Sequence, residues 1–175
     1  MKARAGLVVL GGVLLVAAGC GSSSSSGSST PSSTTPTTTA TTTPSTSSSM
    51  GVTVSTAKVK GLGTVLVDSK GHTLYLFVPD KHAKVTCTGA CATVWPPLKL
   101  PAGQKAVAAG MAKSSMLGSD ADPAGGRVVT YDGWPLYTYV ADTTPGSAIG
   151  QASDLNGGYW YVLSPSGMVI HSKAS

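Results

Sequence analysis

Glutamate is absent from this chain of 175 residues, and only 11% of its residues carry a charged side chain. Phenylalanine occurs once, at Phe77, and cysteine three times. Seven aspartates are therefore the only carboxylate side chains available for acid–base catalysis or metal binding. The chain also lacks a Gly-x-Ser-x-Gly segment, a His-Glu-x-x-His zinc motif and a phosphate-binding loop, so it carries no signature of the common hydrolases or nucleotide-binding enzymes.

The first nineteen residues, 1–19, have the pattern of a secretion signal. Lys2 and Arg4 precede an apolar run that is shorter than the ~20 residues needed to span a membrane. Small residues then lead to Cys20, and Val-Ala-Ala-Gly-Cys at residues 16–20 resembles a bacterial lipobox. The resemblance implies that Cys20 is acylated and becomes the mature N-terminus, which anchors the protein by lipid at the extracytoplasmic face of the cell membrane. An ordinary signal peptide with an incidental cysteine is the alternative.

Residues 20–50 are interpreted as the lipidated cysteine followed by a disordered linker. From residue 21 to residue 49 the chain is almost entirely Ser, Thr, Pro, Gly and Ala, so no large apolar side chain offsets the entropy of ordering the backbone. A random coil of these 29 residues spans ~30 Å. O-glycosylation of the Thr-rich part and an unmodified spacer both stay open. The mature chain has ten basic and seven acidic residues, and a formal charge of +3 does not indicate a nucleic-acid partner.

One segment of the remaining chain occurs twice. Leu-Tyr-Leu-Phe-Val-Pro-Asp at residues 74–80 is matched by Leu-Tyr-Thr-Tyr-Val-Ala-Asp at residues 136–142, with a constant offset of 62. Trp95 and Trp160 continue the match less tightly. We therefore expect one duplicated β domain over residues 51–175, with half-repeats at about 63–103 and 127–167.

Each half has the pattern of a β-hairpin. Turn residues at 68–71 and 132–133 separate an apolar β-branched run from an aromatic strand. In the first aromatic strand, Tyr75 and Phe77 share one face while Leu74 and its alternate neighbours share the other, which predicts a strand covered on both sides.

Weaker patterns complete the expected fold. Val52 and Val54 alternate with polar residues and indicate an edge strand, and residues 159–170 indicate a final hairpin. The Ala and Met content of residues 106–117 predicts a short helix, although Gly110 weakens it. We therefore expect a mainly β fold, an antiparallel sheet domain with a short helix between its two half-repeats.

Several spaced motifs resemble a family of bacterial exported lipoproteins, the secreted repeat of unknown function. Its motif, Tyr-x-(Phe/Trp/Tyr)-x-x-Asp, is present twice, at Tyr75, Phe77 and Asp80 and at Tyr137, Tyr139 and Asp142. Residues 87–98 (Cys-x-Gly-x-Cys-Ala-x-x-Trp-Pro-Pro-Leu) also follow the family's pattern. The resemblance implies an envelope lipoprotein with a duplicated β unit, and it supplies no catalytic residues. At Arg127, relatives tend to have an uncharged polar residue.

The two remaining cysteines, Cys87 and Cys91, are expected to form a disulfide, because an exported even pair is most often oxidised. The alternative is a redox or copper site, since thiolates are soft ligands and histidines at His72 and His82 lie in the same half. A disulfide leaves no thiolate to bind a metal, so the two interpretations exclude each other. The sequence leaves open which of them holds.

The aromatic residues and the two motif aspartates each allow a structural and a chemical interpretation. The aromatic side chains are expected to form core pairs rather than a ligand groove, with Trp134 at a hairpin tip as the best exception. Asp80 and Asp142 are expected to bind backbone amides where their strands end, rather than to act as a general acid and base. On that interpretation, Asp80→Asn should cost little, since the amide oxygen still accepts a hydrogen bond.

These observations favour a lipid-anchored, non-enzymatic cell-envelope module that binds or scaffolds an unknown ligand or protein. No cofactor and no nucleic-acid partner are expected. The alternative is a redox or copper-handling accessory that uses Cys87, Cys91 and a histidine.

The lipid anchor can be tested with Cys20→Ala, which removes the acylated sulfur. We expect the variant to be released or to keep its signal peptide, as shown by cell fractionation and intact mass. If the variant stays in the membrane at the normal mature mass, the lipobox interpretation is wrong.

Overall fold

The computed structural model describes residues 51–81 and 84–173. The expected signal, the lipidation site at Cys20 and the linker up to residue 50 lie outside these residues, and so does His82. Within the described part of the chain, no helix is both long enough and apolar enough to cross a membrane.

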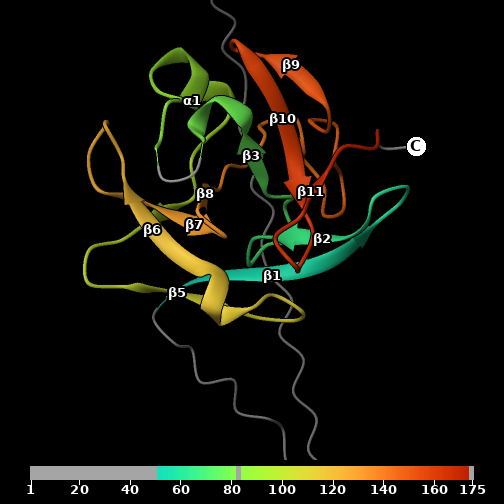
Figure 1. The fold of residues 1–175 in the computed structure, drawn as a ribbon, viewed down its shortest axis with the longest axis horizontal. Helices are drawn as coiled ribbons and strands as arrows, with labels where there is room; N and C mark the ends of the chain where they lie inside the picture. The colour runs from blue at the N-terminus through green and yellow to red at the C-terminus, as the bar shows by residue number, and fades with distance from the viewer. Residues whose placement is uncertain (1–50, 82–83, 174–175) are drawn as a thin grey trace, which may run out of the picture. The chain divides into compact units, whose positions relative to one another are not determined.

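The described residues form three small sheets (Figure 1). The first contains, in order, β2 (Gly63–Val67), β1 (Gly51–Val59) and β5 (Lys105–Ala108). The second contains β11 (Val169–Ile170), β10 (Gly158–Leu163) and β3 (Tyr75–Phe77), with β9 (Ser153–Leu155) also paired to β10. The third contains β4 (Lys99–Leu100), β7 (Arg127–Tyr131) and β6 (Leu117–Ala121), with β8 (Trp134–Pro135) also paired to β7. The helical segments are α1 (Ala90–Val94) and two 3₁₀ turns, η1 (Val78–Asp80) and η2 (Ser114–Met116). The mainly β class and the antiparallel pairing are confirmed, and β1 with β5 is the parallel pair.

The short strand β3 separates two hydrophobic cores. Its three side chains are almost completely buried. Tyr75 and Phe77 belong to an aromatic-rich cluster, whereas Leu74 and Leu76 belong to an aliphatic one. The alternation along this strand therefore predicted its two covered faces correctly. Pro79 follows within η1, and strand pairing ends before it.

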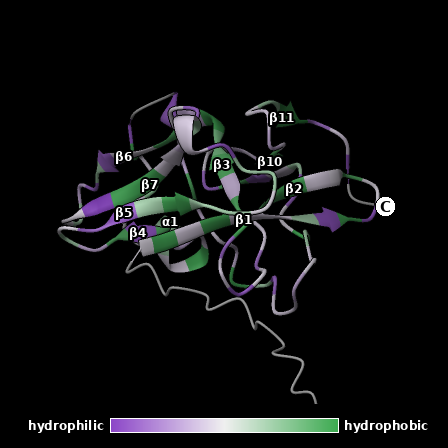
Figure 2. Cartoon of the chain, turned by 90° about the horizontal axis from the view of Figure 1, so that it is seen from below, coloured by the Kyte–Doolittle hydropathy of each residue, from purple (hydrophilic) through white to green (hydrophobic). Residues whose placement is uncertain are grey.

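The strand at Val52 and Val54 is central in its sheet, so the expectation of an edge strand is wrong. β2 pairs with one edge of β1, from Ser55↔Val67 onward, and β5 pairs with the other edge. Hydrophobic and hydrophilic residues alternate along β1 in Figure 2, and the Val54 side chain is fully buried. The alternation showed which face is buried, but the second pairing edge depends on a segment fifty residues away.

The helix expected over residues 106–117 is also wrong. Its first part is β5, and only η2 at its end is helical. Gly110 has φ +60°, which breaks a helix, and a Cβ there would lie 2.6 Å from Thr56 Oγ1. Pairing with β1 therefore outweighs the weak helical propensity of alanine and methionine. The short α-helix, α1, instead contains Cys91 and ends directly before Trp95, inside the first half-repeat.

The first expected hairpin is short, whereas the later ones form as expected. Asp68 Oδ1 accepts the N–H of His72, and the Leu74 N–H donates to Leu66 O over 3.0 Å. The chain then leaves β2, and β3 pairs with β10 through Phe77↔Trp160. β7 with β8 and β10 with β11 form the hairpins of the second half.

Candidate functional site

The two half-repeats meet where β3 passes the start of the second aromatic segment. The Tyr75 N–H donates to Tyr137 O over 2.8 Å, and the Tyr137 N–H donates to Tyr75 O over 2.9 Å. These are equivalent residues of the two halves, so the contact is reciprocal. It marks a local pseudo-twofold relation between the halves.

Four aromatic rings are stacked across this junction. Trp95 and Trp160 lie face to face, with ring centroids 4.0 Å apart and an interplanar angle of 3°. Tyr139 stacks on the outer face of Trp95 at 4.1 Å, and Phe77 stacks on Trp160 at 4.2 Å. Each outer ring therefore contacts the tryptophan of the opposite half. The expectation that these aromatic residues form core pairs agrees with this arrangement.

The two motif tyrosines close the stack from its edges. Tyr75 packs edge-on against Trp95 at 5.3 Å, and Tyr137 packs edge-on against Trp160 at 5.2 Å. Such edge contacts add about 0.5–1.5 kcal/mol each beyond the area they bury. Both tyrosines are completely buried, so their hydroxyl groups need partners inside the protein.

Those partners are the motif aspartates of the opposite half. Tyr75 Oη donates to Asp142 Oδ2 over 2.5 Å, and Tyr137 Oη donates to Asp80 Oδ2 over 2.6 Å. The hydrogen bonds therefore cross between the half-repeats. Two buried carboxylates and two buried hydroxyls satisfy each other across the pseudo-twofold junction.

The second oxygen of each aspartate binds the loop that follows its own strand. Asp80 Oδ1 accepts the backbone N–H of Thr86 over 2.8 Å and its hydroxyl over 2.6 Å. Asp142 Oδ1 accepts the N–H of Ile149 over 2.8 Å and the hydroxyl of Ser147 over 2.9 Å. The expected binding of exit-loop amides is therefore present, together with a hydroxyl donor in each half. The sequence signal for this donor is a hydroxyl residue five or six positions after the aspartate, Ser147 after Asp142 and Thr86 after Asp80.

Tyr75, Asp142, Tyr137 and Asp80 together form what we call the crossed centre. Burial shifts the pKa values of three of these groups. Asp80 is 0% exposed and Asp142 is 3% exposed. Burial raises the pKa of Asp80 above its usual value, and the hydrogen bonds from Thr86 and Tyr137 oppose that rise. Burial and the bonds to the aspartates raise the pKa values of Tyr75 and Tyr137, so both tyrosines remain donors. All of these polar groups are directed at one another inside the core, where they join the two halves.

The cysteine pair lies beside the crossed centre. Cys87 and Cys91 are joined by a disulfide across the start of α1, as expected for an exported pair. The backbone N–H of Cys87 faces the hydroxyl oxygen of Tyr137. The disulfide therefore holds the loop that contacts both partners of the Tyr137–Asp80 hydrogen bond. Thr86 donates to Asp80, and the Cys87 N–H faces Tyr137.

The metal alternative depends on free sulfurs and a histidine. His72 Nδ1 lies 3.1 Å from Asp68 Oδ2, within the turn that precedes β3. Among the described residues, no three His, Cys, Asp or Glu side chains are grouped so that they could hold a metal ion. His82, the other candidate ligand, lies outside those residues.

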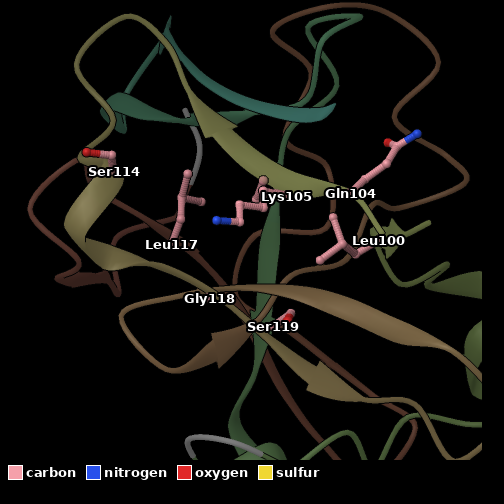
Figure 3. A pocket seen from close by; sticks show the side chains of 8 residues that line it. Leu100, Gln104, Lys105, Ser114, Leu117, Gly118 and Ser119 are labelled. Carbon is pink, nitrogen blue, oxygen red and sulfur yellow. The ribbon is translucent and has the colours of Figure 1, made fainter. Parts of the chain in front are cut away.

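An open cleft of about 290 Å³ lies between β5 and β6 (Figure 3). Its lining combines apolar, hydroxyl and amide groups with one cation, from residues Leu100, Gln104, Lys105, Ala106, Ser114, Leu117, Gly118 and Ser119. Figure 3 shows the side chains of Leu100 and Leu117 turned into the space and Lys105 extended across it. The sequence did not predict this cleft, because residues 106–117 have the composition of a helix and β5 is instead a strand.

Trp134 in β8 and Arg127 in β7 belong to the same sheet as β6, which borders the cleft. Trp134 is partly buried and packs against the aliphatic core. Arg127 Nε donates to Ser119 Oγ over 2.8 Å, and its Nη2 donates to the Ser119 carbonyl. Arg127 thus binds β6 at one end of the cleft.

A family model described as a secreted repeat of unknown function matches residues 56–99 and 118–164, just over half of the chain. Each matched segment contains one copy of the tyrosine–aspartate motif and one tryptophan of the stack. No curated protein and no solved structure matches the chain. The duplication and the suspected family are therefore confirmed.

The crossed centre revises the expected cost of Asp80→Asn. All three partners of the carboxylate donate, and an asparagine turns one acceptor oxygen into a donor. We expect Asp80→Asn to lower the free energy of unfolding by about 1–2 kcal/mol and Asp80→Ala by about 2–3 kcal/mol, measured by denaturant unfolding. A loss below 0.5 kcal/mol in Asp80→Ala would remove the structural role.

The difference in the free energy of unfolding between the wild type and Asp80→Asn should depend on pH. A raised folded-state pKa means that the folded chain binds the Asp80 proton more tightly than the unfolded chain, whose value is near 3.8. That contribution is complete below this value and is lost as the pH rises through the folded-state pKa. The stability of the wild type relative to Asp80→Asn should therefore increase as the pH falls from 7 to 4, and a decrease would contradict the assignment.

The disulfide is tested by the intact mass of protein isolated from the envelope. We expect a mass about 2 Da below the fully reduced value, because the bond removes two hydrogen atoms, and no copper in stoichiometric amount. Free thiols at Cys87 and Cys91 with one tightly held metal per chain, lost in His72→Ala or His82→Ala, would favour the redox or copper alternative instead.

Proposed function

The chain belongs to the family of secreted repeats of unknown function, and from this premise we propose that its folded part is a non-enzymatic binding module of the cell envelope. The family's description as a secreted repeat supports a location outside the cytoplasm. The module is held at the membrane by a lipid on Cys20, with the Ser/Thr/Pro-rich segment 21–49 as spacer. Its binding site is the cleft between β5 and β6.

The observation that carries this proposal is the contrast between the crossed centre and the cleft. The groups best suited to acid–base chemistry, Asp80, Asp142 and their tyrosines, are buried and bonded to one another. The cleft, by comparison, is open and combines apolar side chains with a few polar groups, the composition that suits ligand binding. Binding without turnover is the function that this distribution favours.

The cysteines support the extracytoplasmic location and weaken the redox alternative. A disulfide persists in oxidising compartments such as the outside of the membrane. Cys87 is only 2% exposed, and its sulfur is bonded to that of Cys91, so neither sulfur is a thiolate. A copper-handling role has less support than binding in the cleft.

The proposal is tested by filling the cleft. Lys105→Trp places an indole on an exposed strand position that lines the cleft, and Lys60→Trp places one on an exposed turn elsewhere. The chain with Cys20→Ser, which cannot be lipidated, is added to washed envelopes of the producing cell, and the bound fraction is measured by sedimentation. We expect saturable binding that Lys105→Trp weakens about tenfold or more and Lys60→Trp leaves unchanged. Absence of saturable binding, or equal effects of the two variants, would reject the proposal.

A further inference from the structure

The chemistry of the cleft indicates which ligand it accepts. We propose that the cleft between β5 and β6 binds the carboxyl-terminal end of an extended peptide, which pairs with the open edge of β5 while Lys105 binds its terminal carboxylate. This inference rests on the proposed binding function and names its ligand class. Three features of the described residues carry it: an open strand edge, one unpaired cation and a limited length.

β5 has one edge that is not paired. Its other edge pairs with β1, where the Ala109 N–H donates to Val54 O over 2.9 Å. Because successive residues of a strand direct their backbone groups to opposite edges, Ala106 directs its N–H and C=O away from β1. Ala106 lines the cleft, so these groups are offered on that side.

β6 presents a second open edge to the same cleft. The Asp132 N–H donates to Met116 O, so the alternation along β6 directs the Leu117 C=O and the Ser119 N–H away from β7. Among residues 51–81 and 84–173, no backbone hydrogen bond joins β5 to β6. Cα atoms of β5 and β6 approach within 8 Å. One strand bonded to both edges would hold them about 9.6 Å apart, so an added strand pairs with β5 alone and only contacts β6. An added strand is the ligand that satisfies such an edge.

Lys105 supplies the charge complementarity. It is the charged residue of the lining, and its ammonium has no ion pair or hydrogen bond with the described residues. Figure 3 shows its side chain extended between the two strands, with the nitrogen toward Leu117. A carboxylate placed beside this ammonium would form a charge-assisted hydrogen bond.

The length of the cleft favours a chain end over the middle of a strand. A volume of about 290 Å³ is at the low end of ligand pockets and holds only a few residues. Arg127 occupies the Ser119 carbonyl, so the open edge of β6 ends there. A peptide that ends within the cleft meets both limits, and Leu100 and Leu117 give its last side chains an apolar contact.

The test uses two probes that differ only at the terminus. One is an acetylated tetrapeptide of alternating valine and threonine with a free carboxylate, and the other is the same peptide with a terminal amide. The mature lipidated chain, isotopically labelled in detergent micelles, is titrated with each and followed by the amide resonances of Ala106 and Ser119. We expect saturable shifts with the carboxylate peptide and binding weaker by about tenfold or more with the amide.

Two variants separate the charge from the strand edge. Lys105→Met should weaken binding of the carboxylate peptide about tenfold, Lys105→Arg should largely keep it, and the control Lys60→Met should leave it unchanged. Ala106→Pro removes an N–H that points away from β1, so the fold is kept while peptide binding is lost. Unchanged amide dispersion outside the cleft verifies that fold.

Equal binding of the two peptides, binding that survives both variants, or no saturable shift would overturn the inference. If that happens while Lys105→Trp still lowers binding to envelopes, the cleft binds another ligand and the proposed function stands. If Lys105→Trp also has no effect, the proposed function fails with it.

Discussion

Two buried carboxylates that obtain their donors from the opposite half are the constraint on which this structure depends. A carboxylate without partners in an apolar core is very costly, and hydrogen bonds must offset that cost. Asp80 receives a donor from Tyr137, and Asp142 receives one from Tyr75. Neither half can therefore bury its own aspartate and tyrosine without the other half. The duplication forms one domain rather than two adjacent ones.

The aromatic stack follows from the same junction. The reciprocal backbone contact of Tyr75 and Tyr137 brings the two tryptophans face to face, and Phe77 and Tyr139 then cover their outer faces. Gly150 shows how tightly this region is packed, because a Cβ there would lie 2.5 Å from the Trp95 ring. The backbone N–H of Gly150 also faces the hydroxyl oxygen of Tyr75, as that of Cys87 faces the hydroxyl oxygen of Tyr137, and the first half adds the disulfide. The two halves thus hold their equivalent tyrosines through equivalent contacts and differ in the disulfide of the first half.

Much of this arrangement could be predicted from the sequence, and the rest has identifiable physical reasons. The constant offset between the motifs predicted the duplication, and the alternation at Leu74 to Phe77 predicted two covered faces. The crossing could not be predicted, since each tyrosine matches either aspartate equally well in a repeated motif. The cleft was missed because β5 becomes a strand only through its parallel pairing with the distant β1. Local propensity cannot show such a long-range contact.

A core organised in this way leaves the surface free to carry the function. The crossed centre fixes the path of both motif segments, and the cleft between β5 and β6 lies in other parts of the fold. The most direct test of the crossed arrangement is a double-mutant cycle on the free energy of unfolding, with Tyr75→Phe combined with Asp142→Ala or with Asp80→Ala. The crossed pair should show a coupling of about 1–3 kcal/mol and the same-half pair less than about 0.5 kcal/mol. Equal couplings, or a larger one within the same half, would contradict the account.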